Sequence, residues 1–440
     1  MTEHIVRAGP GLRLALSIQR VSFCLRWEQL FGLAARRNPR RAFLFVSRVL
    51  GKHLAMPPHK LLAAAKLLAL EYTGQEGAAD YLRLLESETS FPELTARLAA
   101  GRTPVAAAER TLFIGFAETA TGLGQALADN FRGEIAYAHT TRVVRPGVPA
   151  LKFTEEHSHA SEHYLYLDSI AAFMAACDRV AFIDDELTTG RTALAGIRAL
   201  NAAYGLRRFL IFSLLDWRST AARQAQAELA AELGVEITAV SLLQGDFREI
   251  GPEPGTDAGA AAMAEAATGA AAGEKTAMPE DFRRSAGGSY ETLDLSALSL
   301  AGGRTPLAGE ALAARPESCR RAAAILADAL PAAPEPTLYV GTGELIYAPL
   351  MCAGYLGGGD FHSTTQSPIV PLAGSAIESG VWFDPPDTYS RAGYLYNVPG
   401  GHYRRAVIFS EKSLTRPEGL GQLASYLRRQ GVGRVTAALL

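Results

Sequence analysis

The sequence is poor in cysteine, in long apolar runs and in excess charge of either sign. It has four scattered cysteines and no C-x-x-C pair, which is typical of a protein with reduced thiols and no disulfide framework (Cys24, Cys177, Cys319 and Cys352). No apolar run reaches the roughly 18 residues that a membrane-spanning helix needs. Lys and Arg number 43 against 45 Asp and Glu, so the net charge of −2 favours neither nucleic acid nor a membrane. The first residues lack the apolar region of a signal peptide, and we expect a cytoplasmic protein.

The length of 440 residues predicts two or three domains. Residues 252–287 are rich in Ala and Gly and carry no apolar stripe, so they cannot bury a core and are predicted to form a mobile linker. The predicted organisation is a helical extension over 1–34, a first domain over 35–250, a linker over 251–290 and a second α/β domain over 291–440.

The most informative stretch is V-A-F-I-D-D-E-L-T-T-G-R-T, residues 180–192. It predicts a buried parallel strand, two carboxylates at its carboxyl end (Asp184 and Asp185), a small polar turn and then a helix. In open α/β sheets, ligands lie beyond the carboxyl ends of strands, and a helix N-terminus offers N–H groups to an anion. The carboxylates can accept hydrogen bonds from a vicinal diol, and Gly190 lets successive amides turn toward one phosphate. Diol and phosphate together describe a ribose 5-phosphate.

A second stretch, T-L-F-I-G-F-A-E-T-A-T-G-L-G over residues 111–124, also predicts a strand, a glycine-containing loop and a helix. Its glycines alone are only a weak indication of a dinucleotide site. Glu118 is unexpected in a loop that would face an anion. It could cap the helix, hold a metal-bound water or meet an acceptor base, and we favour the cap.

Together the two stretches resemble the signature and the pyrophosphate loop of type I phosphoribosyltransferases, which use phosphoribosyl pyrophosphate (PRPP). The resemblance implies a parallel sheet flanked by helices, with Asp184 and Asp185 on the ribose hydroxyls. It implies Mg²⁺ held mainly by PRPP near those two carboxylates. The 5-phosphate would lie on Thr188, Thr189, Gly190, Arg191 and Thr192, and the pyrophosphate on Ala117, Glu118, Thr119, Ala120 and Thr121. A Walker A loop is excluded because no G-K-[ST] follows the turn.

Residues 143–163 occupy the place of the flexible loop that closes over PRPP in these enzymes. Arg142 and His159 are candidates to meet the departing pyrophosphate, and a solvated loop is the alternative. The spacing of His157, His159 and His163 matches no common zinc site. Trp217, at the end of a predicted strand, could stack on a planar acceptor or pack in the core.

Residues 1–110 are predicted to be mostly helical, with a strand over 42–47. The arginines of 36–41 are interpreted as a solvated surface. Lys52 and His53 follow a strand and a glycine, and they are candidates to reach a phosphate-rich ligand.

The C-terminal part repeats pieces of the first domain in the same order. T-L-Y-V-G-T-G-E over 337–344 matches T-L-F-I-G-F-A-E over 111–118, and 362–365 matches the region of 139–141. The acidic pair is replaced by Ser410 and Glu411 and no T-G turn follows, so this degenerate copy is predicted not to bind PRPP.

The whole chain resembles the phosphoribosyltransferases of bacterial tellurite-resistance and stress gene clusters, in which a TRSP domain follows the catalytic domain. The name-giving motif appears here over 364–368 as T-T-Q-S-P, with Gln366 in place of Arg. The resemblance implies transfer of ribose 5-phosphate from PRPP to a nucleobase-like nitrogen acceptor, in the synthesis of a nucleoside-like metabolite. Glu344 and Thr365 are candidates for the acceptor side, and the tandem copy could replace the second subunit of a homodimer as an intramolecular pseudo-dimer. A non-catalytic PRPP or nucleotide sensor, or a scaffold, is the alternative.

Overall fold

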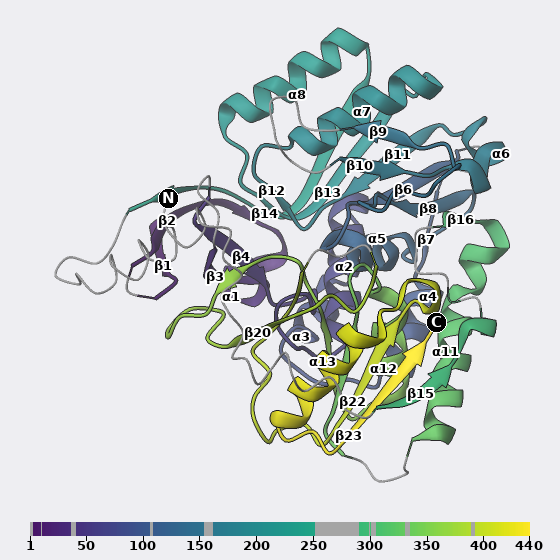
Figure 1. Cartoon of the computed structure of the whole chain (residues 1–440). Helices are drawn as coiled ribbons and strands as arrows, with labels where there is room; N and C mark the ends of the chain where they lie inside the picture. Colours follow the sequence, from purple (N-terminus) through teal and green to yellow (C-terminus); the bar gives the residue numbers. More distant parts are fainter. Residues whose placement is uncertain are drawn as a thin grey trace.

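The computed structural model describes residues 3–9, 11–36, 41–105, 109–153, 162–250, 290–298, 300, 305–330, 335–388 and 392–440. The predicted linker, except for Tyr290, lies outside these residues, and so does His159. Figure 1 shows the chain as two sheets with their helices, the first coloured purple to teal and the second green to yellow. In the described part of the chain, no helix is long and apolar enough to cross a bilayer.

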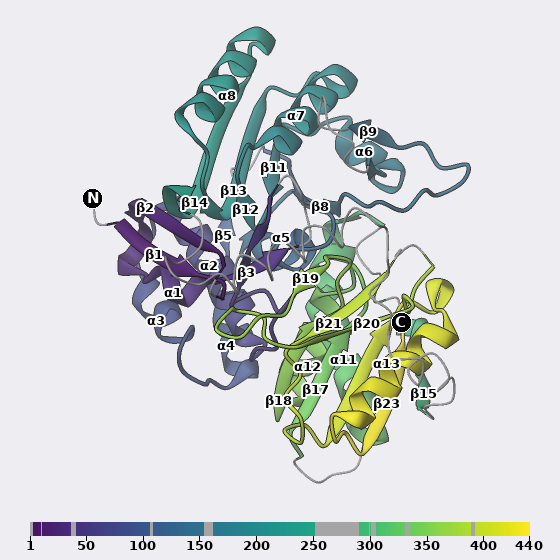
Figure 2. The same ribbon diagram turned by 60° about the vertical axis from the view of Figure 1, so that its left-hand side comes forward.

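The first sheet has the strand order β1-β2-β14-β13-β11-β6-β8-β16, and its central strands are parallel. These are β6 (Thr111–Gly115), β8 (Ile135–His139), β11 (Arg179–Ile183), β13 (Arg208–Asp216) and β14 (Glu236–Glu249), with β12 (Glu186–Leu187) beside β13. The strands β6, β8 and β11 are almost entirely buried because helices cover both faces of the sheet. Figure 2 shows α7 and α8 on the outer side of this sheet, away from the second sheet.

Helices α2 (His59–Thr73) and α5 (Ala120–Ala128) share one core with residues from alternate positions of the central strands. Helices α7 (Arg191–Tyr204) and α8 (Thr220–Leu233) share the other core with the remaining positions. The alternation within one strand shows this division, since Phe182 belongs to the second core and Ile183 to the first. This is the predicted parallel sheet flanked by helices.

The predicted N-terminal helical extension is wrong. Strands β1 (Glu3–Arg7) and β2 (Arg13–Val21) form an antiparallel pair, and β2 continues the sheet along β14. The apolar residues of β2 include Leu14, Leu16 and Ile18, whose period of two suits a strand. Without β2, the backbone N–H and C=O groups of β14 from Leu243 to Glu249 would lack partners on this edge of the sheet.

The rest of the N-terminal region mixes both types of structure. Short elements η1 (Ser22–Cys24) and α1 (Trp27–Leu30) lead into the hairpin β3 (Phe31–Arg36) and β4 (Phe43–Ser47), and β4 confirms the predicted strand. Helices α3 (Ala78–Arg83) and α4 (Phe91–Ala100) follow α2. The remaining short elements of the first half are β5 (Thr103–Pro104), β7 (Phe131–Arg132), β9 (Leu151–Phe153), β10 (His163–Leu165), η2 (Asp168–Ile170) and α6 (Ala171–Met174).

The second sheet has the order β15-β23-β22-β17-β18, and every pair in it is parallel. Its strands are β15 (Glu291–Asp294), β17 (Thr337–Gly341), β18 (Gly359–Ser363), β22 (Arg405–Ser410) and β23 (Arg434–Leu439). Its helices are α11 (Gly309–Ala329), α12 (Tyr347–Leu356) and α13 (Pro417–Arg429). Short elements are η3 (Ser296–Leu298), η4 (Lys412–Leu414) and the antiparallel pair β20 (Gly380–Phe383) and β21 (Gly393–Tyr396).

The two sheets repeat the same central order, since β8-β6-β11-β13 in the first corresponds to β18-β17-β22-β23 in the second. The turns match as well. The Ala117 N–H donates to Thr140 Oγ1 at 2.9 Å. In the second half, the Gly343 N–H donates to Thr364 Oγ1 at the same distance of 2.9 Å. The second half is therefore an α/β copy of the first, as its sequence predicted.

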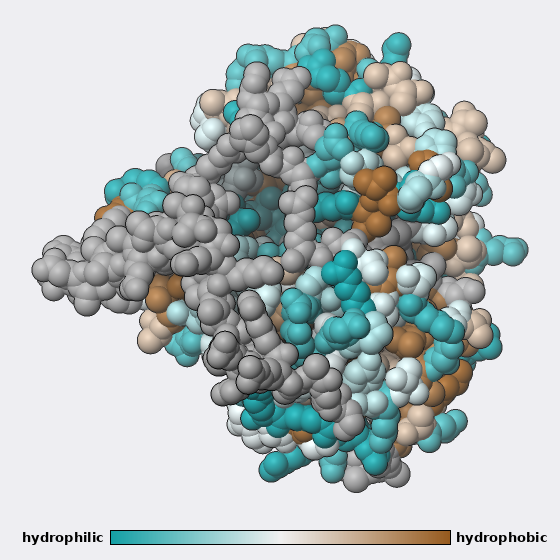
Figure 3. All heavy atoms as spheres, in the orientation of Figure 1, coloured by the Kyte–Doolittle hydropathy of each residue, from teal (hydrophilic) through white to brown (hydrophobic). Residues whose placement is uncertain are grey.

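Strands of the second half also extend sheets of the first. Strand β16 (Leu307–Ala308) pairs with β8, and β19 (Ile369–Val370) pairs with β3. One hydrophobic core includes residues of α5, α11 and α12 and therefore spans both halves, and Figure 2 shows the first sheet above the second. On the face drawn in Figure 3, the hydrophobic residues form only scattered patches.

Candidate functional site

The acidic pair is fixed at the carboxyl end of β11 by the neighbouring strand. The Asp184 N–H donates to Phe212 O at 2.9 Å, and Asp185 O accepts two N–H groups of β13 at 3.2 Å each. The Asp185 N–H donates to Asp184 Oδ1 at 3.0 Å. Both carboxyl groups are therefore held at the sheet edge by backbone contacts.

The electrostatics of this pair favour a ligand that donates hydrogen bonds. Burial raises the pKa of Asp184 well above its ordinary value, and the adjacent Asp185 carboxylate raises it further. Burial also raises the pKa of Asp185. Hydroxyl groups that donate to these oxygens would stabilise the ionised form.

The turn that follows is shaped for an anion at the start of α7. Gly190 precedes the helix with a φ of +71°, a left-handed conformation that other residues adopt at a cost. The Arg191 N–H donates to Thr189 Oγ1 at 3.3 Å. The start of a helix favours a negative charge because its first N–H groups have no intrahelical acceptor, and this turn lies at the start of α7.

Arg218, two residues beyond the end of β13, supports this turn. Its guanidinium forms a bidentate pair with the buried Asp216, with Nε–Oδ1 and Nη2–Oδ2 distances of 2.9 Å. Burial raises the pKa of Asp216, but the bonds from Arg218 outweigh this effect and hold it below the ordinary value. A Cβ atom on Gly190 would lie 3.2 Å from Arg218 Cδ, so the turn has little room for a larger residue.

The second predicted loop lies directly beside the first. The Phe116 N–H donates to Ile183 O at 2.9 Å, which joins the end of β6 to the end of β11. Phe116 to Thr119 connect β6 to α5, and Ala120 and Thr121 begin that helix, so the predicted pyrophosphate loop and the acidic pair share one sheet edge.

The favoured role of Glu118 as a helix cap is wrong. Residue Thr119 precedes α5, and no side chain caps the helix N-terminus. Glu118 has a φ of +67° and pairs with Arg142, with 3.1 Å between Nη1 and Oε1. The sheet places Arg142 just past the end of β8, next to β6, and this ion pair brings Arg142 to the loop.

His163 also lies at this edge and has a defined partner. Its Nδ1 is 3.0 Å from Thr140 Oγ1, and its ring stacks on Phe153. Burial, reinforced by the charge of Arg142, lowers the pKa of His163 to about 4. The imidazole is therefore neutral at neutral pH.

Glu344 from the second half enters this site. Its Oε2 accepts a hydrogen bond from Thr141 Oγ1 at 2.9 Å and lies 3.8 Å from His139 Nε2. Its backbone oxygen accepts one from Thr121 Oγ1 at 3.1 Å. The side chain of Glu344 is only 2% exposed, so these contacts form in an environment with little water. The second half thereby contacts both the pyrophosphate loop and the end of β8.

Lys52 joins the two halves of the chain by hydrogen bonds. Its Nζ donates to Gly343 O at 3.0 Å and to Thr364 O at 2.9 Å, and the residue is 1% exposed. Its ammonium group is thus bound by the protein, which argues against the interpretation that it reaches a phosphate. His53 Nε2 lies 3.5 Å from Thr365 Oγ1, so Thr365 lies near the contacts between Lys52 and the second half.

Trp217 packs in the core. It is 2% exposed and stacks on Phe45 with 5.0 Å between ring centroids, and Phe31 and Phe247 meet it edge to face. The face that a planar acceptor would need is taken, so the stacking interpretation is wrong. The β3–β4 hairpin carries the aromatic residues that fill this position.

Two arginines of the predicted solvated turn belong to the site. Arg41 Nη2 lies 2.5 Å from Glu186 Oε1, one residue beyond the acidic pair, and its guanidinium covers the Phe43 ring at 4.6 Å. Burial lowers the pKa of Arg36, and the charges that act on it include Glu118 and Glu186. The solvated-surface interpretation is therefore wrong for these two residues. Glu186 was missed although it directly follows Asp185.

Comparisons with known proteins agree with this geometry. A family model described as a phosphoribosyl transferase matches residues 30–246, and a second, described as the TRSP domain that follows it, matches residues 301–427. No curated protein matches the chain.

Solved structures with detectable similarity include adenine phosphoribosyltransferases. The enzyme from Trypanosoma brucei, in complex with AMP, pyrophosphate and ribose-5-phosphate, is 19% identical; the match covers 34% of this chain and 64% of that one, with a TM-score of 0.25. The enzyme from Giardia lamblia, complexed with 9-deazaadenine, is 17% identical, with 40% and 83% covered and a TM-score of 0.23. These TM-scores are too low to assign a family, which follows from the two family models alone. The chain belongs to the family in which a phosphoribosyltransferase domain is followed by a C-terminal TRSP domain.

Proposed function

We propose that the chain transfers ribose 5-phosphate from PRPP to a nucleobase-like nitrogen acceptor and releases pyrophosphate. The observation that carries this proposal is the adjacency of the two loops. The acidic pair with its glycine turn and the 117–121 loop follow neighbouring parallel strands, joined by the bond from Phe116 to Ile183. A ligand with a phosphate at one end and a pyrophosphate at the other fits such a pair of loops.

In the proposed reaction the C1–O bond to pyrophosphate breaks and a C1–N bond to the acceptor forms. Positive charge builds on the sugar as the first bond breaks. Asp184 and Asp185 accept hydrogen bonds from the ribose hydroxyls and stabilise that charge, while the turn over 188–192 holds the 5-phosphate. The amides that follow Ala117 in this loop meet the pyrophosphate, and the acceptor nitrogen loses its proton to water once it is bound to C1.

The residues present fit a role for Mg²⁺ that depends on the substrate. Among the described residues, no group of three potential ligands gathers around one point. Asp184 and Asp185 offer the oxygen ligands that Mg²⁺ prefers, and Mg²⁺ commonly keeps only one or two carboxylates and takes the rest from phosphates and water. These two carboxylates would hold the ion with PRPP, where it would neutralise charge on the pyrophosphate.

The second half supplies the acceptor side in this proposal. Glu344 reaches Thr141 and the pyrophosphate loop, and Arg142 pairs with Glu118 across the same space. The contact of Thr365 with His53, and the bond from the preceding Lys52 to Gly343 beside Glu344, support Thr365 as a further candidate. Polar groups on this inner edge can orient a nitrogen heterocycle, which then becomes part of a nucleoside-like metabolite. The repeated topology gives one chain the two halves that a dimer would otherwise provide, as an intramolecular pseudo-dimer.

The release of pyrophosphate tests the proposal. The chain is incubated with PRPP, Mg²⁺ and a panel of purine, pyrimidine and pyridine bases, and pyrophosphate is measured enzymatically. Base-dependent release that disappears in the Asp184→Asn, Asp185→Asn double variant supports the transferase. Tight PRPP binding without release for any base would instead indicate a sensor or a scaffold, the second candidate. The sensor or scaffold is less favoured, because a protein that only binds PRPP does not need an acceptor side, to which we assign Glu344 and Arg142.

A further inference from the structure

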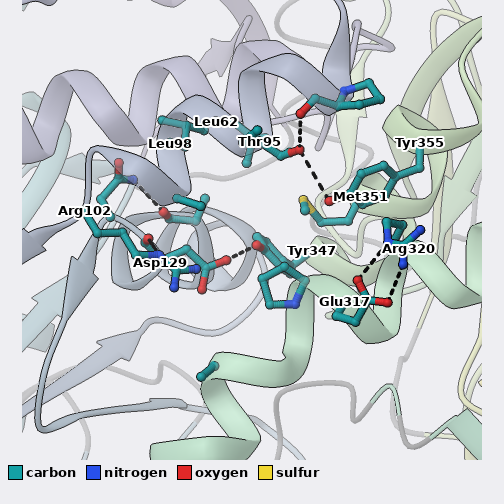
Figure 4. A pocket seen from close by; sticks show the side chains of 17 residues that line it. Leu62, Thr95, Leu98, Arg102, Asp129, Glu317, Arg320, Tyr347, Met351 and Tyr355 are labelled. Carbon is teal, nitrogen blue, oxygen red and sulfur yellow. Dashed lines mark hydrogen bonds and ion pairs between the residues drawn. The ribbon is translucent and has the colours of Figure 1, made fainter.

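A cavity lies at the junction of the two halves, and no residue of the two loops of the proposed active site lines it. It has a volume of about 450 Å³ and is lined by α4, the end of α5, α11 and α12. This volume is within the range of pockets that bind small molecules. Figure 4 shows its labelled side chains, with Leu62 and Thr95 on one side and Glu317 and Arg320 on the other.

The walls combine apolar surface with few polar groups. Leu62, Leu98 and Met351 contribute apolar surface, and Tyr347 and Tyr355 contribute aromatic rings. This composition suits a flat, largely apolar ring system.

Asn130, which lines this cavity, has one buried polar atom without a hydrogen-bond partner in the described part of the chain. Asn130 is 2% exposed, and its Nδ2 donates to Ala126 O at 2.8 Å. Its Oδ1 has no partner among the described residues, although it is buried. A buried acceptor without a partner is costly, so a bound water is expected beside it.

A smaller cavity of about 100 Å³ adjoins the first, since Arg102, Asp129 and Ala313 line both, and it adds Arg132. Arg102 Nε donates to Asp129 O at 2.9 Å. Neither arginine forms an ion pair with a carboxylate of the described residues. This end is therefore cationic.

The carboxylates nearby are already neutralised. Asp129 Oδ1 pairs with Arg315 at 2.5 Å, and Asp129 Oδ2 accepts a bond from Tyr347. Glu317 pairs with Arg320 at 2.6 Å. An anionic group at the arginine end would thus meet two guanidinium groups with little opposing charge.

We infer that these joined cavities bind a nucleoside 5′-monophosphate. The base lies between the apolar walls, and the phosphate meets Arg102 and Arg132. The choice of a nucleotide over another anionic heterocycle rests on the proposed function, whose product is a ribonucleotide.

The joined cavities are connected to the proposed active site through α5 and α12. Asn130 lies just past the end of α5, and the 117–121 loop begins that helix. Tyr347 begins α12, three residues after Glu344. A bound nucleotide therefore contacts elements that lead directly to both sides of the proposed site.

The test measures the number of nucleotides bound per chain by calorimetry, with AMP, GMP, CMP and UMP as probes and inorganic phosphate as the control. The Gly190→Val chain is used to close the active site, and the variants of the joined cavities are Arg102→Gln and Ala99→Trp. Ala99 is an exposed residue of α4 that lines the cavity, so tryptophan there fills space without disturbing the core. Arg83→Gln is the matched control, because Arg83 is exposed and lines neither cavity.

We expect at least one nucleotide to bind the wild-type chain at two sites and the Gly190→Val chain at one. Arg102→Gln should weaken the remaining site about tenfold or more, the effect of losing one charge-assisted hydrogen bond, and Ala99→Trp should abolish it. Arg83→Gln should change nothing. A Gly190→Val chain that binds none of the four nucleotides, or binds phosphate as well as any of them, overturns the second site and leaves the proposed function standing. Two sites in the Gly190→Val chain would contradict the assignment of the active-site turn instead.

Discussion

The contact between Thr141 and Glu344 allows a quantitative test of how the two halves cooperate. The bond is 2.9 Å long and Glu344 is nearly inaccessible to water, so solvent screens it little. A hydrogen bond to a charged group contributes about 1.5–3 kcal/mol. In a double-mutant cycle with Thr141→Val and Glu344→Met, we therefore expect a coupling energy of about 1.5–3 kcal/mol in the free energy of unfolding.

The cycle is measured by urea denaturation of the four chains, with the KM for PRPP as a second readout. The bond from Thr141 holds the side chain of Glu344, whose backbone oxygen accepts a hydrogen bond from Thr121 of the pyrophosphate loop. Loss of the side-chain bond should therefore loosen this backbone contact, so both single variants should raise that KM, and the double variant should raise it by less than the product of the two. Thr238→Val is the control partner, since Thr238 is exposed on β14 and should combine additively with Glu344→Met. Additivity of Thr141→Val and Glu344→Met within about 0.5 kcal/mol would refute the proposed coupling.

Further predictions concern the signature and the aromatic cluster. Replacing Asp184 and Asp185 by Asn should abolish transfer and raise the melting temperature of the ligand-free chain in neutral buffer. Burial raises the folded-state pKa of both groups, so the stability they contribute is complete below the ordinary aspartate pKa and is lost as pH rises through the raised values. Melting curves across pH should show this loss in the wild type only; a parallel loss in the double variant would contradict it. Gly190→Val should block PRPP binding in calorimetry, with about 1–2 kcal/mol from the left-handed backbone alone, whereas Thr188→Ala should only weaken it. The opposite ranking would mean that the turn is not a phosphate site. Trp217→Ala should destabilise the fold by about 3–5 kcal/mol in denaturation experiments, while Trp217→Phe should leave the KM for the acceptor unchanged; a raised KM would restore the stacking role.

The signature and the parallel sheet could be predicted because both depend on local sequence. The apolar strand, the acidic pair and the glycine turn are contiguous over 180–192, and their geometry follows from a strand that leads into a helix. The repeat was also visible, because the strands and turns of the second half keep the order and several identities of the first.

The N-terminal strands could not be predicted with the same ease. Short apolar runs such as Leu14 to Ile18 suit a helix or a strand, and the choice depends on whether a sheet edge is available. Here β14 provides that edge from more than 200 residues away in the sequence.

The roles of Lys52, Arg41 and Trp217 depend on long-range contacts. A lysine after a glycine suits a phosphate site, but Lys52 meets two carbonyl groups of the second half, which no local pattern encodes. Arg41 forms an ion pair with Glu186, and Trp217 stacks on Phe45 of the β3–β4 hairpin. Both are contacts between residues far apart in the sequence. Glu118 is held by Arg142 in a backbone conformation that its residue type does not suggest.

The most direct test of the central claim is a crystal structure of the chain with PRPP and Mg²⁺. We predict the ribose hydroxyls on Asp184 and Asp185, the 5-phosphate on the turn over 188–192, and the pyrophosphate on the loop over 117–121. PRPP bound elsewhere, or bound with its ribose hydroxyls away from both carboxylates, would contradict the assignment of this site.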